Sequence, residues 1–204
     1  MAWYFYLIYI SMLFCIVVSL YHLVRIIRLG NAKDYSKPAG DVKAAVKYSM
    51  TVAMSPTKKE SAYLHLPTYA AGILYHIGTF VSFLLLVLFI LEIEFPNILN
   101  ILLSVFLSIT TICGVSILIK RMFSKDLKLI SNPDDYISNI LVTAFQLVTV
   151  LHLINSGYIL FIFASVLFLY IPFGKLKHFI YFFAARYQLG LFFGHRGTWP
   201  VKNK

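Results

Sequence analysis

The sequence predicts an all-α membrane protein, a bundle of five transmembrane helices with its N-terminus outside and its C-terminus in the cytoplasm. Of its 204 residues, 60% are hydrophobic and 13% are charged, which is more apolar than a soluble domain usually is. The apolar residues occur in long runs, so lipid has to supply burial that a soluble core could not. The basic residues flank these runs on one predicted side, which sets the orientation.

Five apolar segments are long enough to cross a hydrocarbon core, which takes about 20 residues of α-helix. They cover residues 3–27, 69–93, 98–119, 136–153 and 158–183. An odd number of spans puts the two termini on opposite sides. The links after the second and fourth segments contain no Lys or Arg, whereas the links after the first and third are rich in both. We therefore expect one membrane domain over residues 1–204, crossing the inner (cytoplasmic) membrane several times.

The formal net charge of +10 has to be explained by where the basic residues lie. All 18 Lys and Arg fall within residues 25–59, 120–128 and 175–204, each group beside an apolar run. This distribution is the positive-inside pattern, which orients a membrane protein. Basic residues also neutralise the phosphates of nucleic acids, but this placement predicts membrane lipid and no nucleic acid as the partner.

The largest extramembrane segment is the predicted cytoplasmic loop, residues 28–67. Within it, residues 41–54 place Val and Ala between Lys43 and Lys47 in the pattern of an amphipathic helix. Such a helix could lie at the inner membrane surface, or it could be a docking surface for a cytoplasmic subunit. Further along the chain, residues 131–135 read Ser-Asn-Pro-Asp-Asp, which predicts the cap that starts the fourth span.

Four of the six histidines, His22, His76, His152 and His178, lie inside predicted spans, where polar side chains are costly and usually functional. Of these, His76 and His178 are the informative pair. At 1.5 Å per residue, His76 lies roughly 10 Å and His178 roughly 8 Å from the inner face. Two imidazoles at one depth on different helices can supply both axial nitrogens to the iron of a b-type haem. The alternative is a kinked helix whose lysines reach the interface and whose histidines bond neighbouring helices. Spacing alone leaves both interpretations open.

The residues around these histidines suit a bound haem. Gly72 and Gly78 flank His76 and thin the helix where a flat macrocycle would approach. Lys175 and Arg186 are candidates for contacts with haem propionates. The two cysteines have no partner at CxxC spacing, so the sequence encodes neither a zinc site nor a covalently attached haem.

Four stretches carry a resemblance to a known family. They are residues 75–78 (Tyr-His-Ile-Gly), 120–124 (Lys-Arg-Met-Phe-Ser), 172–178 (Pro-Phe-Gly-Lys-Leu-Lys-His) and 186–189 (Arg-Tyr-Gln-Leu). With them, the chain resembles the gamma subunit of respiratory nitrate reductase. It is also similar to the cytochrome b subunits of heterodisulfide reductase and of the sulfite-reduction-associated membrane complex.

The resemblance implies a membrane cytochrome b in a respiratory chain oxidoreductase, an electron-transfer subunit rather than an enzyme alone. Such a subunit passes electrons between menaquinone or ubiquinone and an iron–sulfur protein subunit on the cytoplasmic face. His76 and His178 match the pair that holds the haem nearer the cytoplasm. The family's second haem would need ligands at Leu86 and Leu160, which cannot bind iron. One haem b is therefore expected.

A second haem could be held by other histidines, with His65 and His195 as the candidate pair, although Pro67 reads as a first-turn residue that leaves His65 in a loop or cap. With a single inner haem, quinone is expected to react near it, and His22, Arg25 and Tyr75 are candidates for that pocket. From a different functional class, the chain could be a haem-free structural anchor or assembly subunit for a cytoplasmic enzyme.

Overall fold

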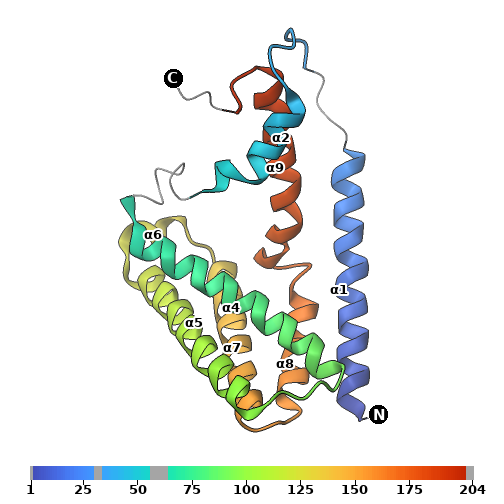
Figure 1. Ribbon diagram of the computed structural model, residues 1–204, viewed down its shortest axis with the longest axis vertical. Helices are drawn as coiled ribbons and strands as arrows, with labels where there is room; N and C mark the ends of the chain where they lie inside the picture. Colours follow the sequence, from blue (N-terminus) through green and yellow to red (C-terminus); the bar gives the residue numbers. More distant parts are fainter. Residues whose placement is uncertain (1, 30–33, 56–63, 201–204) are drawn as a thin grey trace. The chain divides into compact units, whose positions relative to one another are not determined.

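The computed structural model describes residues 2–29, 34–55 and 64–200, and within these ranges the protein is helical with no strand (Figure 1). In the same residues, four helices are long and apolar enough to cross a membrane. They are α1 (Trp3–Arg28), α4 (Leu66–Ile90), α5 (Asn97–Phe123) and α7 (Pro133–Ile154). The prediction of an all-α, multi-pass membrane protein is confirmed at this level.

The structure differs from the sequence prediction in the last apolar segment, which is not one helix over residues 158–183. Helix α8 covers Ile159–Tyr170, and after a turn the short 3-10 helix η3 (Lys175–Lys177) leads into α9 (His178–His195). Pro172 has no amide hydrogen and cannot continue the helix. Twelve residues of helix extend about 18 Å, too short to cross alone. A fifth span therefore requires α8 and the helical residues after it to form one broken span.

Contacts group the chain into two units. Unit 1 consists of Met1–Val17 and Pro67–Leu176, and unit 2 of Val18–Leu66 and Lys177–Lys204. Helix α1 contributes its first half to unit 1 and its second half to unit 2.

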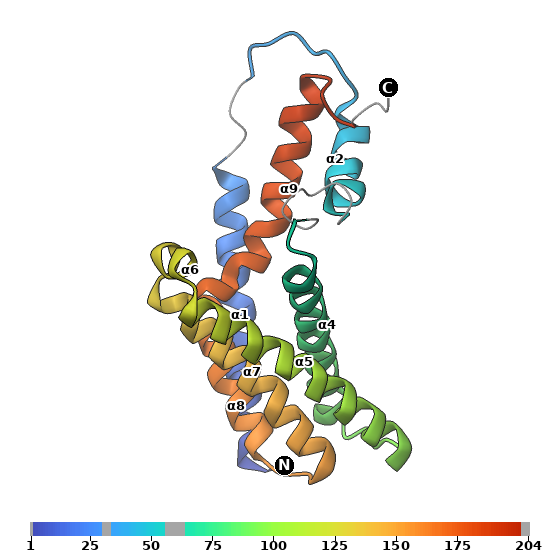
Figure 2. The same ribbon diagram turned by 90° about the vertical axis from the view of Figure 1, so that its left-hand side faces the viewer.

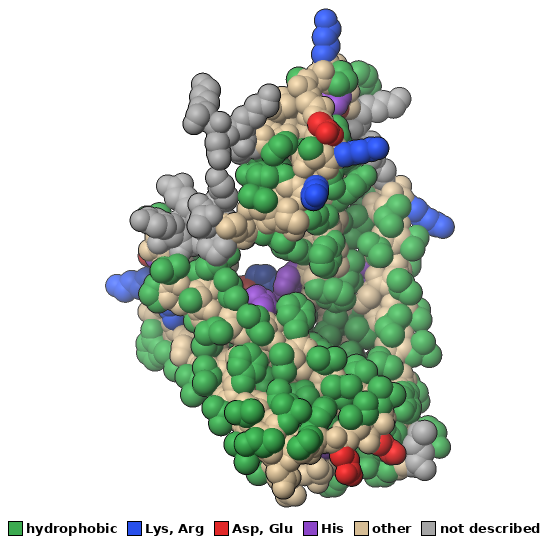
Figure 3. All heavy atoms as spheres, in the orientation of Figure 1, with side chains coloured by type: hydrophobic (Ala, Val, Ile, Leu, Met, Phe, Trp, Pro, Cys, Tyr) green, Lys and Arg blue, Asp and Glu red, His purple; other side chains and the backbone are tan. Residues whose placement is uncertain are grey.

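In unit 1, α7 is the central helix, packed against α5 on one side and α8 on another (Figure 2). Its core contains Phe145 and Leu167, both fully buried, together with Ile8 of α1. The outward faces are also apolar, and Figure 3 shows hydrophobic side chains over the visible surface of α4 and α5. Helices that bury apolar side chains on one face and expose them on the other are suited to lipid.

The start of α7 confirms the predicted cap. The Asn132 side chain accepts a hydrogen bond from the Asp135 amide at 3.1 Å, and the Asp135 carboxylate accepts one from the Asn132 amide at 3.0 Å. Pro133 occupies the first turn, where its missing amide hydrogen costs nothing. A short helix, α6 (Lys125–Ile130), lies between α5 and this cap.

In unit 2, α2 (Val42–Met50) packs along α9 and is followed by the 3-10 helix η1 (Val52–Met54). Helices α2 and η1 occupy the segment expected to be helical over residues 41–54. Asp41 caps α2, accepting hydrogen bonds from two backbone amides. Gly190 and Gly194 of α9 lie directly against α2: an added Cβ would be 2.6 Å from the Val46 Cα and the Ala45 Cβ, respectively. Glycine at these two positions therefore permits the close approach.

Candidate functional site

His76 lies on an exposed face of α4, in unit 1. Gly72 is four residues earlier, one helical turn away, and so lies on the same face. A Cβ added at Gly72 would meet nothing within 4 Å, which means that the surface beside His76 is open. An open surface therefore lies beside this imidazole on α4.

His178 is the first residue of α9 and is also exposed, in unit 2. It follows directly on η3, at the point where the broken helix resumes. Its pairing with His76 stays a prediction.

The two leucines at the positions of the second family haem lie in a closed environment within unit 1. Leu86 of α4 and Leu160 of α8 are each 1% exposed and belong to the same hydrophobic cluster. Phe145 of α7 and Phe161 of α8 are part of that cluster as well. Side chains already fill the volume around both leucines.

Tyr75, a candidate for the quinone pocket, is buried against α7 instead of facing an open surface. Its hydroxyl donates to the carbonyl oxygen of Asn139 at 3.1 Å and lies 3.0 Å from Oγ1 of Thr143. The other two candidates belong to unit 2, on α1. There the His22 ring lies 6.4 Å from the ring of Tyr181, and Arg25 is exposed in the last turn.

The sequence analysis missed Gln146, which is the centre of a buried polar network in unit 1. This side chain is fully buried on α7. Its Nε2 donates to the Tyr75 carbonyl oxygen at 3.0 Å and to Thr79 Oγ1 at 2.8 Å, both on α4. Its Oε1 accepts from Thr110 Oγ1 of α5 at 2.8 Å. One amide thus bonds two neighbouring helices; a glutamine in mid-span is the signal that could have revealed it.

Small residues let these three helices approach closely around the network. Gly78 of α4 lies against the side chain of Thr110, and Gly114 of α5 lies against the Tyr75 ring and Thr143. Any Cβ at either glycine would overlap these atoms. Gly78, expected to make room for a macrocycle, therefore serves helix packing, whereas Gly72 faces the open side.

Lys175, a candidate for a propionate contact, pairs with Asp135 at the start of α7. The same carboxylate lies 2.9 Å from Nη1 of Arg121 at the end of α5. Asp135 is buried while Lys175 is half exposed. The cluster of two cations and one carboxylate connects α5, α7 and η3 within unit 1.

Arg186, the other propionate candidate, is bonded to α2 in unit 2. Its Nε donates to the Ser49 carbonyl oxygen at 2.8 Å, and its Nη2 donates to the same oxygen. In return the Ser49 hydroxyl donates to the Arg186 carbonyl oxygen at 2.6 Å. The guanidinium therefore fixes α9 against the end of α2.

His65 and His195, the candidate second pair, both belong to unit 2. His65 is exposed in a turn just before α4, as its position before Pro67 predicted. His195 Nε2 lies 2.8 Å from the Ser36 carbonyl oxygen, which can only accept a hydrogen bond. Nδ1 is therefore the ring nitrogen of His195 that could bind a metal, and the pairing stays a prediction.

An ion pair near His195 has a titratable member. Arg196 Nη1 lies 2.6 Å from the Asp34 carboxylate, and the Arg196 guanidinium lies 3.7 Å from the centre of the Phe192 ring. Hydrogen bonds from the hydroxyl and amide of Ser36 hold the pKa of Asp34 below its usual value, with a further contribution from Arg196. Asp34 is therefore charged at neutral pH.

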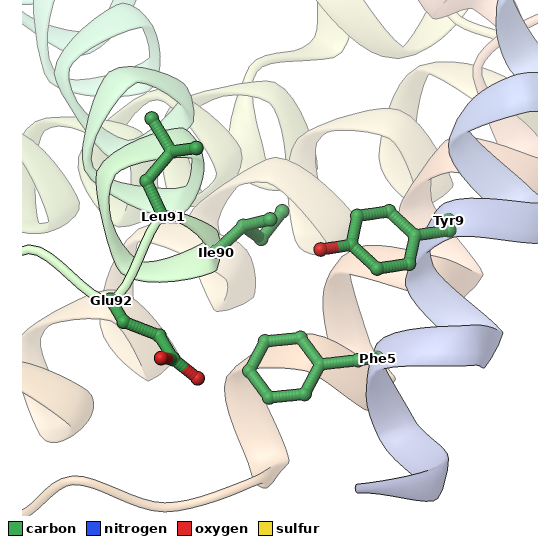
Figure 4. Close-up of a pocket in the computed structure, with 5 residues that line it drawn as sticks. All are labelled: Phe5, Tyr9, Ile90, Leu91 and Glu92. Atoms are coloured by element: carbon green, nitrogen blue, oxygen red, sulfur yellow. The ribbon is translucent and has the colours of Figure 1, made fainter. Parts of the chain in front are cut away.

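A cavity of about 190 Å³ opens in unit 1 between the first half of α1 and the end of α4 (Figure 4). Phe5 and Tyr9 line it from α1, and Ile90, Leu91 and Glu92 line it from the other side. In Figure 4 the Glu92 carboxylate points toward the Phe5 ring. Four of the five lining residues are hydrophobic or aromatic, and Glu92 is the acidic one.

In the part of the chain that the structure describes, no group of three or more His, Cys, Asp or Glu side chains could hold a metal ion. Haem iron takes only two axial ligands from the protein, so this finding does not bear on haem binding. No family model matches the sequence, and no curated protein or solved structure is significantly similar to it.

Proposed function

We propose that this chain is the membrane-anchoring cytochrome b subunit of a respiratory oxidoreductase complex. It holds one b-type haem through His76 and His178 and passes electrons between the quinone pool and an iron–sulfur subunit in the cytoplasm. The observation that carries the proposal is the open face of α4, where the His76 imidazole and the unfilled space at Gly72 lie one turn apart.

The residues present fit the proposed cofactor. Polar side chains inside a helix apolar enough to cross a membrane are costly and usually functional, and His76 is such a residue. The space at Gly72 is the kind of cradle that a planar macrocycle can occupy and that a Cβ would reduce. A second exposed imidazole, His178, begins the helix whose preceding turn contains the basic residues of the family-like motif.

When bound, a b-type haem supplies one-electron transfer. The chain's contribution is to hold the iron by two neutral imidazole nitrogens and to keep the surroundings apolar. Lys175 and Arg186, three residues before and eight residues after His178, are the candidates for contacts with the propionates. Arg186 already donates to the α2 backbone, and Lys175 already pairs with Asp135. Each side chain would therefore have to share its N–H donors between its present partner and a propionate.

The packing of Leu86 and Leu160 supports a single haem. Both leucines are buried in one apolar cluster, so their positions offer neither a ligand nor space. Of the two α4 positions at which the family has haem ligands, His76 therefore offers a ligand and Leu86 does not, and the charge pattern assigns the half of α4 with His76 to the cytoplasmic side. We infer that quinone reacts on that side, near His22 and Arg25.

A reduced-minus-oxidised absorption spectrum of the purified protein tests the proposal. We expect a b-type α-band in the natural chain and its loss in His76→Ala and in His178→Ala. His152→Gln is the matched control, because His152 contacts the backbone of Gly157 and is not a proposed ligand. The absence of a band, or a band that survives both alanine substitutions, would overturn the proposal and leave the haem-free membrane anchor as the interpretation.

A further inference from the structure

We propose that Gln146 is a positioning residue: it fixes the rotation of α4 about its own axis and thereby sets the direction in which His76 and Gly72 face. Its consequence for haem binding rests on the function proposed above. The effect on α4 itself does not, because it follows from contacts within unit 1.

The hydrogen bonds of Gln146 reach the part of α4 that surrounds His76. The amide nitrogen bonds to the carbonyl oxygen of Tyr75, the residue immediately before His76, and to the hydroxyl of Thr79, the residue three positions after it. The two acceptors lie about 40° apart around the helix, because 3.6 residues make one turn. They therefore define one face of α4 and hold it toward α7.

The face that carries His76 follows from this attachment. His76 is one residue beyond Tyr75 and so lies about 100° around the helix, beside Gly72 on the open surface. A rotation of α4 that moved His76 would also move the Tyr75 carbonyl and the Thr79 hydroxyl away from Gln146. The direction of the imidazole is thus coupled to the two hydrogen bonds of one amide.

The surroundings make such a rotation costly. Gln146 is fully buried, so water does not replace a lost partner, and an unpaired amide in an apolar interior is strongly unfavourable. The oxygen of the same amide is held from the other side by Thr110 of α5. Packing also opposes a rotation of α4, because the Tyr75 ring lies against Gly114 and the Thr110 side chain lies against Gly78.

Thr149 offers a matched control on the same helix. It is fully buried, as Gln146 is, but its hydroxyl donates to the carbonyl oxygen of Phe145 within α7 at 2.8 Å. Thr149→Val removes a buried polar group of α7 without breaking a bond between helices. Gln146→Leu removes a buried polar group and its bonds to α4 and α5.

The rotation of α4 can be measured by electron paramagnetic resonance between two spin labels in the reduced full-length protein. The labels are placed at Ile77→Cys on α4 and Ile101→Cys on α5, both exposed positions of unit 1, after Cys15→Ala and Cys113→Ala. We expect Gln146→Leu to broaden the distance distribution about two-fold, because the polar contacts that hold neighbouring helices are lost. Thr149→Val should leave it unchanged. An unchanged distribution in Gln146→Leu, or equal broadening in both variants, would overturn the inference.

A second readout connects the position of α4 with the cofactor and separates the two proposals. In haem-loaded protein, Gln146→Leu should weaken haem binding about ten-fold, the lower end of the range for residues that orient a ligand. It should also change the low-spin ferric resonance spectrum, which reports how the axial imidazoles are oriented. If the natural chain has no b-type band, the proposed function fails while the spin-label distances still decide the role of Gln146. If the band is present and Gln146→Leu alters neither distances nor spectrum, the positioning role alone is wrong.

Discussion

The two α4 positions that match the family's haem ligands, His76 and Leu86, have opposite environments. Around His76 the helix has an open face, with an exposed imidazole and empty space at Gly72. Near the other end, Leu86 is 1% exposed and packs in one cluster with Leu160 of α8. The same helix thus combines an open surface with one that is sealed by apolar packing. The residue that can bind iron, His76, lies beside open space, whereas the residue that cannot, Leu86, is enclosed by side chains. This difference is why we propose one haem rather than two.

The largest expected effect is at Leu86, in the sealed cluster. Leu86→Ala removes a buried, closely packed side chain. It should lower the free energy of unfolding in detergent by about 3 kcal/mol, as alanine substitutions of buried leucines usually do. Leu84→Ala is the control, because Leu84 lies two residues away on the same helix and is 58% exposed. Equal losses of unfolding free energy in the two variants would mean that the surroundings of Leu86 are not sealed as described.

The open face at Gly72 should respond in the opposite way. Gly72→Leu adds a side chain whose Cβ would have nothing within 4 Å, so the fold should keep or slightly gain stability, since glycine is about 1 kcal/mol worse than leucine in a helix. Under the proposed function, the same substitution should reduce haem occupancy about ten-fold by filling the cradle. Haem titration of apoprotein and chemical unfolding measure the two effects separately. A destabilised variant would show that the face at Gly72 is not open. Full haem affinity would show that this face does not receive the cofactor.

A smaller effect is expected where α5, α7 and η3 meet. Asp135→Asn keeps an oxygen that can cap α7 but removes the charge that faces Arg121 and Lys175. Because both cations are partly exposed, the loss of unfolding free energy should be about 1 kcal/mol. Asp126→Asn, at an exposed position of α6, should change the free energy of unfolding by less. The comparison fails if high salt does not reduce the difference between the two variants.

The smallest effect concerns pH and unit 2. The pKa of Asp34 is lowered from 3.8 in the folded state, so its contribution to stability is present above that pH and is lost as pH falls through the lower, folded value. The natural chain should therefore lose stability below pH 3.8 more steeply than Asp34→Asn does. Unfolding midpoints measured from neutral pH down to acid check this. Parallel curves for the two proteins would remove Asp34 from the account.

Much of the fold could be predicted because lipid imposes simple rules on sequence. The four long helices were visible as apolar runs, and the cap of α7 was visible in Asn132 and Asp135. The break between α8 and α9 was harder, since Pro172 signals a kink but not whether the helix resumes in line.

The candidate site was predictable only in part. His76 stood out because imidazole is rare and costly in a span. Gln146 did not, because a single neutral amide barely changes the hydropathy of an apolar run and its partners lie 36 to 71 residues away. That two glycines near His76 differ, one facing open space and the other packed on Thr110, depends on tertiary packing that no spacing rule provides.

The most direct test of the account is the number of haems bound per chain, measured as the haem-to-protein ratio of the purified natural chain and of His76→Ala. The account predicts one b-type haem in the natural chain and none in the variant. A ratio of two would contradict the proposal of a single haem per chain. No haem in the natural chain, or one haem retained in His76→Ala, would contradict the central claim.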